Sequence, residues 1–175
     1  MAIGATINKV SITVSDMDRR YYRHHELVLA VHPSENDVRF IIRVIAFALN
    51  AHDDLVFTKG VGADDEPEMW IKSLTGDIDV WIDFGQVDEK RIRKACGRAK
   101  RVVVYTYQER KAHLWWEQCR ATLARHSNLT VFHVRAEGAE ALVKRNMSLQ
   151  CNIDDGSVYL GDGTVGIDVT VTQLS

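Results

Sequence analysis

The chain has 175 residues, of which 46% are hydrophobic, and its formal net charge is −2 at pH 7. This length and composition fit a single globular domain over residues 1–175 with a substantial apolar core. A pI near 6.4 excludes a globally basic protein, so binding to DNA or RNA would need a local basic patch.

Other bulk features predict the compartment. No apolar run approaches the roughly 20 residues of a membrane span, and the N-terminus lacks the basic and apolar regions of a signal peptide. The three cysteines are far apart, odd in number and form no CxxC pair, which predicts no disulfides and no zinc site. We therefore expect a bacterial, cytoplasmic protein without a membrane partner.

The first fifty residues predict a β-hairpin and a helix. Apolar and polar residues alternate from Thr6 to Val14, and a second strand is predicted from Tyr21 to Val31. The segment HPSENDVRFIIR then predicts a helix, because Ser34 and Asp37 have the spacing of a capping box. In this interpretation Glu35 lies in the first turn of the helix.

The middle of the chain alternates strands and helices. LVFTKGV predicts a short strand, and GADDEPEMWIKSLTG predicts a long acidic loop. A strand from Ile78 to Phe84 follows, then a helix capped by Asp88, and then the apolar run RVVVYTY, which is typical of a strand buried on both faces. A third helix and the strand LTVFHV complete a pattern that favours parallel pairing through right-handed crossovers.

The tail from Met147 predicts three strands separated by turns. The two ends of the chain are therefore expected to form hairpins that pair with each other. The predicted fold class is α/β (α+β): one domain with a mixed sheet, helices packed on it, and N- and C-terminal β-hairpin extensions.

The strand IDVWIDF carries a column of acids. Asp77, Asp79 and Asp83 share their parity with Trp81, so these side chains point to one side of the strand, which we expect to be the side opposite the core. Asp is a poor strand former, whereas Mg²⁺ binds one or two carboxylates and keeps several waters. A Mg²⁺ site here would activate water toward a phosphodiester. The alternative is a solvent-facing strand with acids at its ends.

Several stretches together resemble the YaeQ family of small bacterial proteins over essentially the whole chain. They are HPSENDVRFIIR, LVFTKGVGADDEPEMW, IDVWIDFGQVDEKRIRKAC, VVVYTY and WW. The resemblance implies a variation on the PD-(D/E)xK restriction-endonuclease-like fold, with a four-stranded mixed sheet in αβββαβ order. In that superfamily a helix Glu, a strand Asp and a (D/E)xK pair bind Mg²⁺ and activate water.

Carried over by position, the resemblance implies that Glu35, Asp79 and Asp83 are the metal ligands. Asp64 or Asp65 would stand in for the acid that precedes the (D/E)xK strand. Asp79 and Asp83 would also be catalytic, through the water that the Mg²⁺ ion holds.

The sequence departs from this superfamily at its lysine. Counted from either strand acid, the lysine position is filled by Trp81 or Gly85, and neither can stabilise charge as an ammonium does. Lys94, on the helix that follows, is the first candidate to replace it as a catalytic residue. Lys59 and Gln86 come next.

Basic residues crowd one face of the second predicted helix. Lys90, Arg91, Lys94 and Arg98 belong to this face, and Lys59 could join them in contacting nucleic-acid phosphates. The simpler interpretation is a solvated helix face. The sequence therefore supports two functions: a Mg²⁺-dependent, nuclease-like protein acting on DNA or RNA, or a non-catalytic regulator that binds nucleic acid or a protein partner, such as the transcription machinery.

Overall fold

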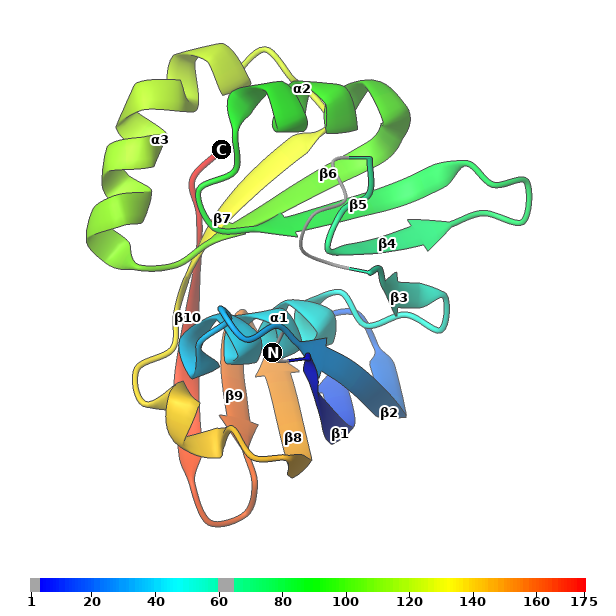
Figure 1. Cartoon of the computed structure of the whole chain (residues 1–175), viewed down its shortest axis with the longest axis vertical. Helices are drawn as coiled ribbons and strands as arrows, with labels where there is room; N and C mark the ends of the chain where they lie inside the picture. Colours follow the sequence, from blue (N-terminus) through cyan, green and yellow to red (C-terminus); the bar gives the residue numbers. More distant parts are fainter. Residues whose placement is uncertain (1–3, 60–64) are drawn as a thin grey trace. The chain divides into compact units, whose positions relative to one another are not determined.

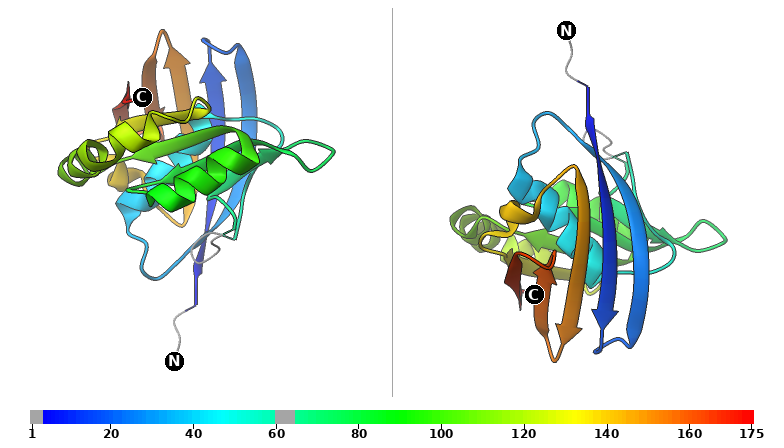
Figure 2. Two further views of the ribbon diagram at one scale, coloured as in Figure 1. Left: turned by 90° about the horizontal axis from the view of Figure 1, so that it is seen from above. Right: turned by 90° about the horizontal axis from the view of Figure 1, so that it is seen from below.

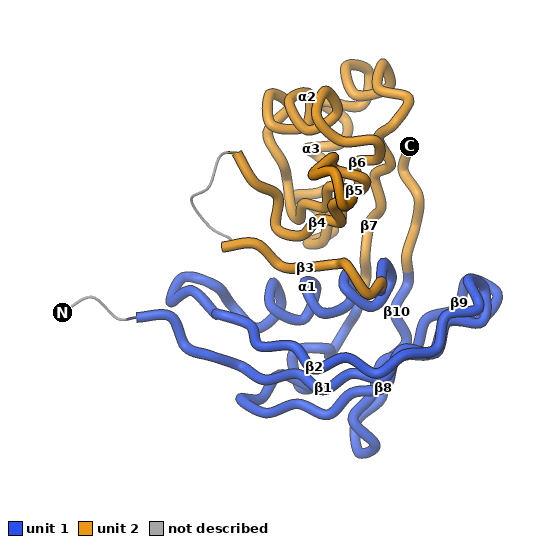
Figure 3. The backbone as a smooth tube through the Cα atoms, turned by 90° about the vertical axis from the view of Figure 1, so that its right-hand side faces the viewer, with its two compact units in different colours: residues 1–51, 136–170 blue, residues 52–135, 171–175 orange. Residues whose placement is uncertain are grey.

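The computed structural model describes residues 4–59 and 65–175. It divides the chain into two compact units, each built from two separate segments (Figure 3). Unit 1 contains Met1–Ala51 and Ala136–Thr170, and unit 2 contains His52–Arg135 and Val171–Ser175. The chain thus passes between the units three times. The sequence predicted a single domain over residues 1–175, and this stays a prediction.

The sheet of unit 1 has the strand order β2-β1-β8-β9-β10. Its strands are β1 (Thr6–Asp16), β2 (Tyr21–Val31), β8 (Asn146–Asp154), β9 (Ser157–Gly161) and β10 (Gly166–Gln173), whose last residues belong to unit 2. The β1–β2, β8–β9 and β9–β10 pairs are antiparallel, which confirms the hairpins predicted at both ends. The two ends also pair, because β1 lies parallel to β8 (Figure 2, right).

One face of this sheet forms the core of unit 1. Val10, Ile12 and Val14 on β1 are fully buried, and the buried residues of β8 pair with them. The helix α1 (Asp37–Leu49) and the short 3₁₀ helix η1 (Ala139–Leu142) contact each other in the same unit. Every residue of α1 from Phe40 to Ala48 is buried, and Arg43 is the one charged residue in this run.

The start of α1 differs from the sequence prediction. Asn36 is the N-cap, and its side-chain oxygen accepts a hydrogen bond from the Arg39 amide at 2.9 Å. Ser34 instead bonds the ring of His32, so the capping box was wrong. Asn is among the best N-cap residues and stands directly before the helix. Glu35 therefore precedes α1 and does not lie in its first turn.

The sheet of unit 2 has the strand order β7-β6-β5-β4-β3. Its elements are β3 (Leu55–Phe57), β4 (Met69–Lys72), β5 (Ile78–Phe84), α2 (Glu89–Arg98), β6 (Ala99–Thr106), α3 (Glu109–Leu123) and β7 (Leu129–Arg135). β5, β6 and β7 are parallel, as the alternation of strands and helices predicted, whereas β4 pairs antiparallel with both neighbours.

The strand β4 corrects the sequence prediction of one long loop. Met69–Lys72 pairs with β5, with Met69 opposite Ile82, and both of these residues are fully buried. The run is only four residues long, and it lies between acidic and polar turn residues that hide its alternation. The acids before it still form an irregular segment where the structure describes them.

The helices α2 and α3 cover one face of the unit 2 sheet (Figure 1; Figure 2, left). Trp81 of β5, at 1% exposure, lies in the core that they form with Ile92 of α2 and Leu123 of α3. Asp88 caps α2 by accepting from the Lys90 amide, as predicted. The face of β5 that carries the acids is therefore the helix-covered face, and the expectation that it lies opposite the core was wrong, because α2 and α3 bury the side that Trp81 shares with the acids.

The predicted mixed α/β class is confirmed. Along the chain, α1, β3, β4, β5, α2 and β6 follow one another in the α-β-β-β-α-β order that the family resemblance implied. None of the described helices has the length and apolar character needed to cross a membrane. All three cysteines are free, and burial raises the pKa of the Cys119 thiol to about 11 and that of Cys151 to about 12.

A closed carboxylate site on β5 and α2

The acidic side chains along β5 become less exposed from Asp77 to Asp83. Asp77, just before the strand, is exposed and bonds the hydroxyl of Thr75 at 2.9 Å. Asp79 has a side chain that is 34% exposed, and Asp83 is only 3% exposed. The three side chains share a parity but not an environment, so they do not form one uniform column.

Asp83 is surrounded by hydrogen-bond donors. Arg91 of α2 binds it with two nitrogens: Nε lies 2.9 Å from Oδ2, and Nη2 lies 3.0 Å from Oδ1. The indole Nε1 of Trp81 donates to Oδ2 at 2.8 Å, and the backbone amide of Glu68 donates to Oδ1 at 3.1 Å. A bidentate guanidinium is the strongest common partner of a carboxylate. Asp83 is therefore buried within unit 2, its charge is paired with that of Arg91, and both of its oxygens accept hydrogen bonds.

Basic side chains of α2 also form hydrogen bonds with the acidic segment that precedes β4. Arg91 Nη2 donates to the Glu66 carbonyl at 2.8 Å, and Arg98 Nη1 donates to the Asp65 carbonyl at 2.6 Å. Lys94 bonds the carboxylate of Asp65, and this contact lowers the pKa of that carboxyl group. Lys94, the predicted substitute for the missing lysine, thus has Asp65 as its partner. Asp64, the other candidate, lies outside the described residues.

Asp79 has a different kind of partner. Lys100, at the start of β6, places its Nζ 2.6 Å from Asp79 Oδ1, and this contact raises the pKa of Lys100. The lysine side chain is 68% exposed. Asp79 is thus a solvent-accessible acid in a surface ion pair.

The turn after β5 explains why no lysine follows Asp83 at the expected spacing. Gly85 has φ +85°, a left-handed conformation that a residue with a Cβ adopts only with strain. Its amide donates to the Tyr105 carbonyl at 2.8 Å, which ties the turn to β6. Gln86 donates to the Tyr107 carbonyl at 3.2 Å, so this neutral candidate has a structural partner.

Glu35 lies in unit 1 and is engaged there. Its side chain is 3% exposed and accepts from Arg39 Nη1 at 3.0 Å and from Arg43 Nη1 at 2.9 Å. Arg43 also donates to the Ala30 carbonyl on β2 at 3.2 Å. The carboxylate therefore joins the residues before α1 to the helix itself.

These carboxylates do not fit a Mg²⁺ ion as they are arranged. Across residues 4–59 and 65–175, no group of three or more His, Cys, Asp or Glu side chains could hold a metal. Glu35 and Asp83 each direct their oxygens at an internal guanidinium, which occupies the lone pairs that a cation would use. Lys59, a predicted phosphate-binding residue, is exposed in the bend after β3.

The residues around α2 form a dense basic segment. Residues 89–101 contain one acid, Glu89, and seven basic residues: Lys90, Arg91, Arg93, Lys94, Arg98, Lys100 and Arg101. Four of the seven contact the acids or carbonyls described above. Lys90, Arg93 and Arg101 are exposed and form no ion pair within the described part of the chain.

Arg91 is the residue whose role the sequence did not reveal. It was assigned to the phosphate-contacting face, but its guanidinium lies on Asp83, eight residues before it in the chain. No local spacing rule links a strand residue to a residue on the following helix. The parity that Asp83 shares with Trp81 grouped the acids on one face of β5, but it did not show that α2 covers that face.

The fold and this site define a class: a mixed α/β protein with an α-β-β-β-α-β element order and a carboxylate site closed by its own arginine. The YaeQ family model matches residues 1–171, and the chain belongs to the YaeQ family. It is 39% identical to the YaeQ protein of Escherichia coli (strain K12) and 37% identical to that of Salmonella typhi, over 98% of this chain and 97% of each relative.

Solved structures of the same family also match over nearly the whole chain. The crystal structure of YaeQ from Xanthomonas axonopodis pv. citri has a TM-score of 0.94 at 40% identity and covers 98% of both chains. The crystal structure of YaeQ from Pseudomonas syringae has a TM-score of 0.91 at 26% identity, with 98% of this chain and 96% of that chain covered. The resemblance drawn from the sequence motifs is thereby confirmed.

Proposed function

We propose that the chain is a non-catalytic nucleic-acid-binding protein on a nuclease-like fold. The observation that carries this proposal is the state of Asp83, which is buried and held by Arg91 and Trp81. A metal-dependent phosphodiesterase needs such an acid open to a cation and to its waters. Here a guanidinium supplies the positive charge instead, so the oxygens of Asp83 are not open to a metal.

The binding surface in this proposal is the exposed part of the basic segment 89–101. Lys90 and Arg93 on α2 carry charges that the internal ion pairs do not use. Arg101 is left out of this surface, because its pairing with Val80 places it on the sheet face opposite α2. Cationic side chains of this kind neutralise phosphates and release counterions, which gives affinity without sequence specificity. This revises the predicted set, since Arg91 and Lys94 already hold Asp83 and Asp65.

The test is a binding titration of labelled double-stranded DNA, single-stranded DNA and RNA by fluorescence anisotropy across a salt series. We expect the double variant Lys90→Ala/Arg93→Ala to bind about tenfold more weakly and to lower the salt slope by about 2. The matched control is Arg110→Ala/Lys111→Ala, which removes two exposed charges from α3. Absence of binding at low salt would overturn the proposal and would point to a protein partner.

Metal-dependent cleavage is the second candidate function. Two observations favour it: the α-β-β-β-α-β element order, and the 34% exposure of the Asp79 side chain, which leaves that acid within reach of a cation. The assay compares cleavage of plasmid DNA and of RNA in Mg²⁺, in Mn²⁺ and in EDTA. Under the first proposal the DNA and the RNA stay uncut in all three conditions. Cleavage that needs the metal and is lost in Asp79→Ala would establish the nuclease instead.

A further inference from the structure

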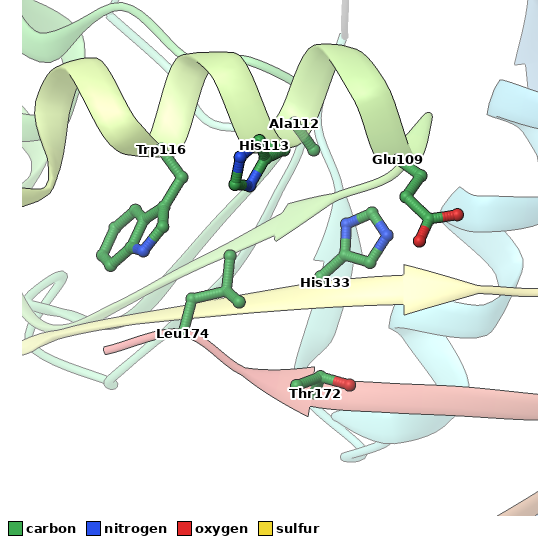
Figure 4. Close-up of a pocket in the computed structure, with 7 residues that line it drawn as sticks. All are labelled: Glu109, Ala112, His113, Trp116, His133, Thr172 and Leu174. Atoms are coloured by element: carbon green, nitrogen blue, oxygen red, sulfur yellow. The ribbon is translucent and has the colours of Figure 1, made fainter.

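A small pocket lies in unit 2 between α3 and the strands β7 and β10 (Figure 4). Its volume is about 190 Å³. The walls are Ala112, His113 and Trp116 of α3, His133 of β7, and Thr172 and Leu174 of the C-terminal segment. An apolar cavity of about 150 Å³ is large enough for benzene, so this pocket can hold one small ring.

The contacts of Thr106 bear on which nitrogen of His133 carries the ring proton. The Thr106 hydroxyl donates its one proton to the Phe132 carbonyl at 3.2 Å, and its oxygen lies 3.0 Å from His133 Nδ1. With this hydroxyl proton on Phe132, Nδ1 carries the ring proton and donates to Thr106, and Nε2 is then a bare acceptor. Burial lowers the pKa of His133, which favours the neutral ring, although the nearby Glu109 carboxylate opposes this effect.

Among the other polar wall residues, Glu109, His113 and Thr172, the Glu109 carboxylate is a further acceptor. Glu109, in the first turn of α3, lines the pocket at the end where His133 lies, and Trp116 lies further along the helix (Figure 4). A carboxylate and a bare imidazole nitrogen both select N–H donors. The face of Trp116 favours a positive charge through its ring quadrupole. These three groups therefore favour the same chemistry.

We propose that this pocket binds a small aromatic cation that carries N–H donors, of the amidinium class. The ring would lie against Trp116 and Leu174, and the charged N–H groups would point to the Glu109 carboxylate and to His133 Nε2. Thr106 acts as a positioning residue, because it sets the ring tautomer without lining the pocket. This site uses α3 and β7, so it stands independently of the nucleic-acid surface on α2.

The test is an NMR titration of the full-length protein with benzamidine. We expect millimolar binding, which is usual for a fragment of this size, with the largest shifts at the Trp116 indole and the His133 ring. Benzoate and benzyl alcohol are the charge-reversed and neutral probes, and both should bind at least about tenfold more weakly. Equal binding of benzoate, or shifts confined to residues outside the pocket, would overturn the proposal.

Two variants separate the proposed roles. Glu109→Gln should weaken benzamidine binding about fivefold, whereas Glu117→Gln, an exposed acid on the same helix, should leave it unchanged. Thr106→Val keeps the side-chain shape but frees Nδ1, so the ¹⁵N shifts of His133 should reveal a mixture of tautomers together with weaker binding. Equal affinities in Glu109→Gln and Glu117→Gln, or an unchanged tautomer and affinity in Thr106→Val, would contradict the site as drawn.

Discussion

Asp79 and Asp83 lie on the same side of one strand, yet they differ in burial and in partner. Asp83 is 3% exposed and is gripped by the planar fork of Arg91, whereas the side chain of Asp79 is 34% exposed and meets the flexible end of Lys100. Arginine suits a buried bidentate contact, and lysine suits a hydrated point contact. Strand parity decides on which side of the sheet an acid lies, but its burial decides whether its oxygens are open to solvent and ligands.

The same contrast appears between the acids that the family resemblance grouped as metal ligands. Glu35 in unit 1 and Asp83 in unit 2 are both buried, and each has an arginine of its own unit as a partner. Asp79 is the one of the three that reaches solvent. The predictions below test this division between closed and open carboxylates.

The largest effect is expected when the partner of Asp83 is removed. Arg91→Met should lower the free energy of unfolding by about 3 kcal/mol, because it leaves a buried carboxylate without its counter-charge. Chemical denaturation measures this loss. Arg93→Met removes an exposed arginine from the same helix and serves as the control. Equal losses in the two variants would show that the Arg91–Asp83 pair is no more than a surface contact.

A smaller loss is expected at the corresponding carboxylate of unit 1. Glu35→Gln should cost about 2 kcal/mol, since glutamine keeps one acceptor oxygen but loses the charge that faces Arg43. Asp37→Asn, in the exposed first turn of α1, should cost no more than about 0.5 kcal/mol through the helix dipole. The comparison fails if the two variants have the same denaturation midpoint.

A substitution at Gly85, two residues after Asp83, tests why the superfamily lysine is missing at this position. Gly85→Ala should destabilise the protein by about 1 kcal/mol, because φ +85° strains any residue with a Cβ. Gly97→Ala should instead stabilise α2 by about 0.5 kcal/mol, since that glycine is helical and a Cβ there meets nothing. Thermal unfolding of both variants should move the midpoint in opposite directions. A shift in the same direction would remove the backbone explanation.

The smallest effect is expected at the open carboxylate. Asp79→Asn breaks an exposed ion pair, and such pairs contribute little to stability. Its unfolding midpoint should stay within the scatter of repeated wild-type measurements, at low and at high salt. A salt-dependent loss comparable to that of Arg91→Met would place Asp79 with the closed carboxylates.

Much of the secondary structure could be predicted because it depends on local patterns. The strand Ile78–Phe84 and the Asp88 cap agree with the sequence prediction, since apolar periodicity and capping side chains act within a few residues. The errors arose where a local signal was short or had a competitor. The β4 strand was hidden in an acidic stretch, and Asn36 replaced Ser34 as the cap of α1.

The candidate site was predictable only in part. The acids were identified from their parity with Trp81 and from the family resemblance, but neither observation could supply their partners. Asp83 meets Arg91 across a helix-on-sheet contact, and Asp79 meets Lys100 from the next strand. Such pairs depend on the register between β5 and β6 and on how α2 lies over them, and neither follows from local spacing.

By itself the sequence determined the family, the grouping of the acids on one side of β5, and the order of the strands and helices apart from β4, because these follow from periodicity and motif. Only the tertiary structure decided that β1 pairs parallel with β8 and that Asp83 is closed by Arg91 while Asp79 stays open. The physical reason is burial. The free energy of a carboxylate depends on the groups that exclude water from it, and those groups come from other parts of the chain.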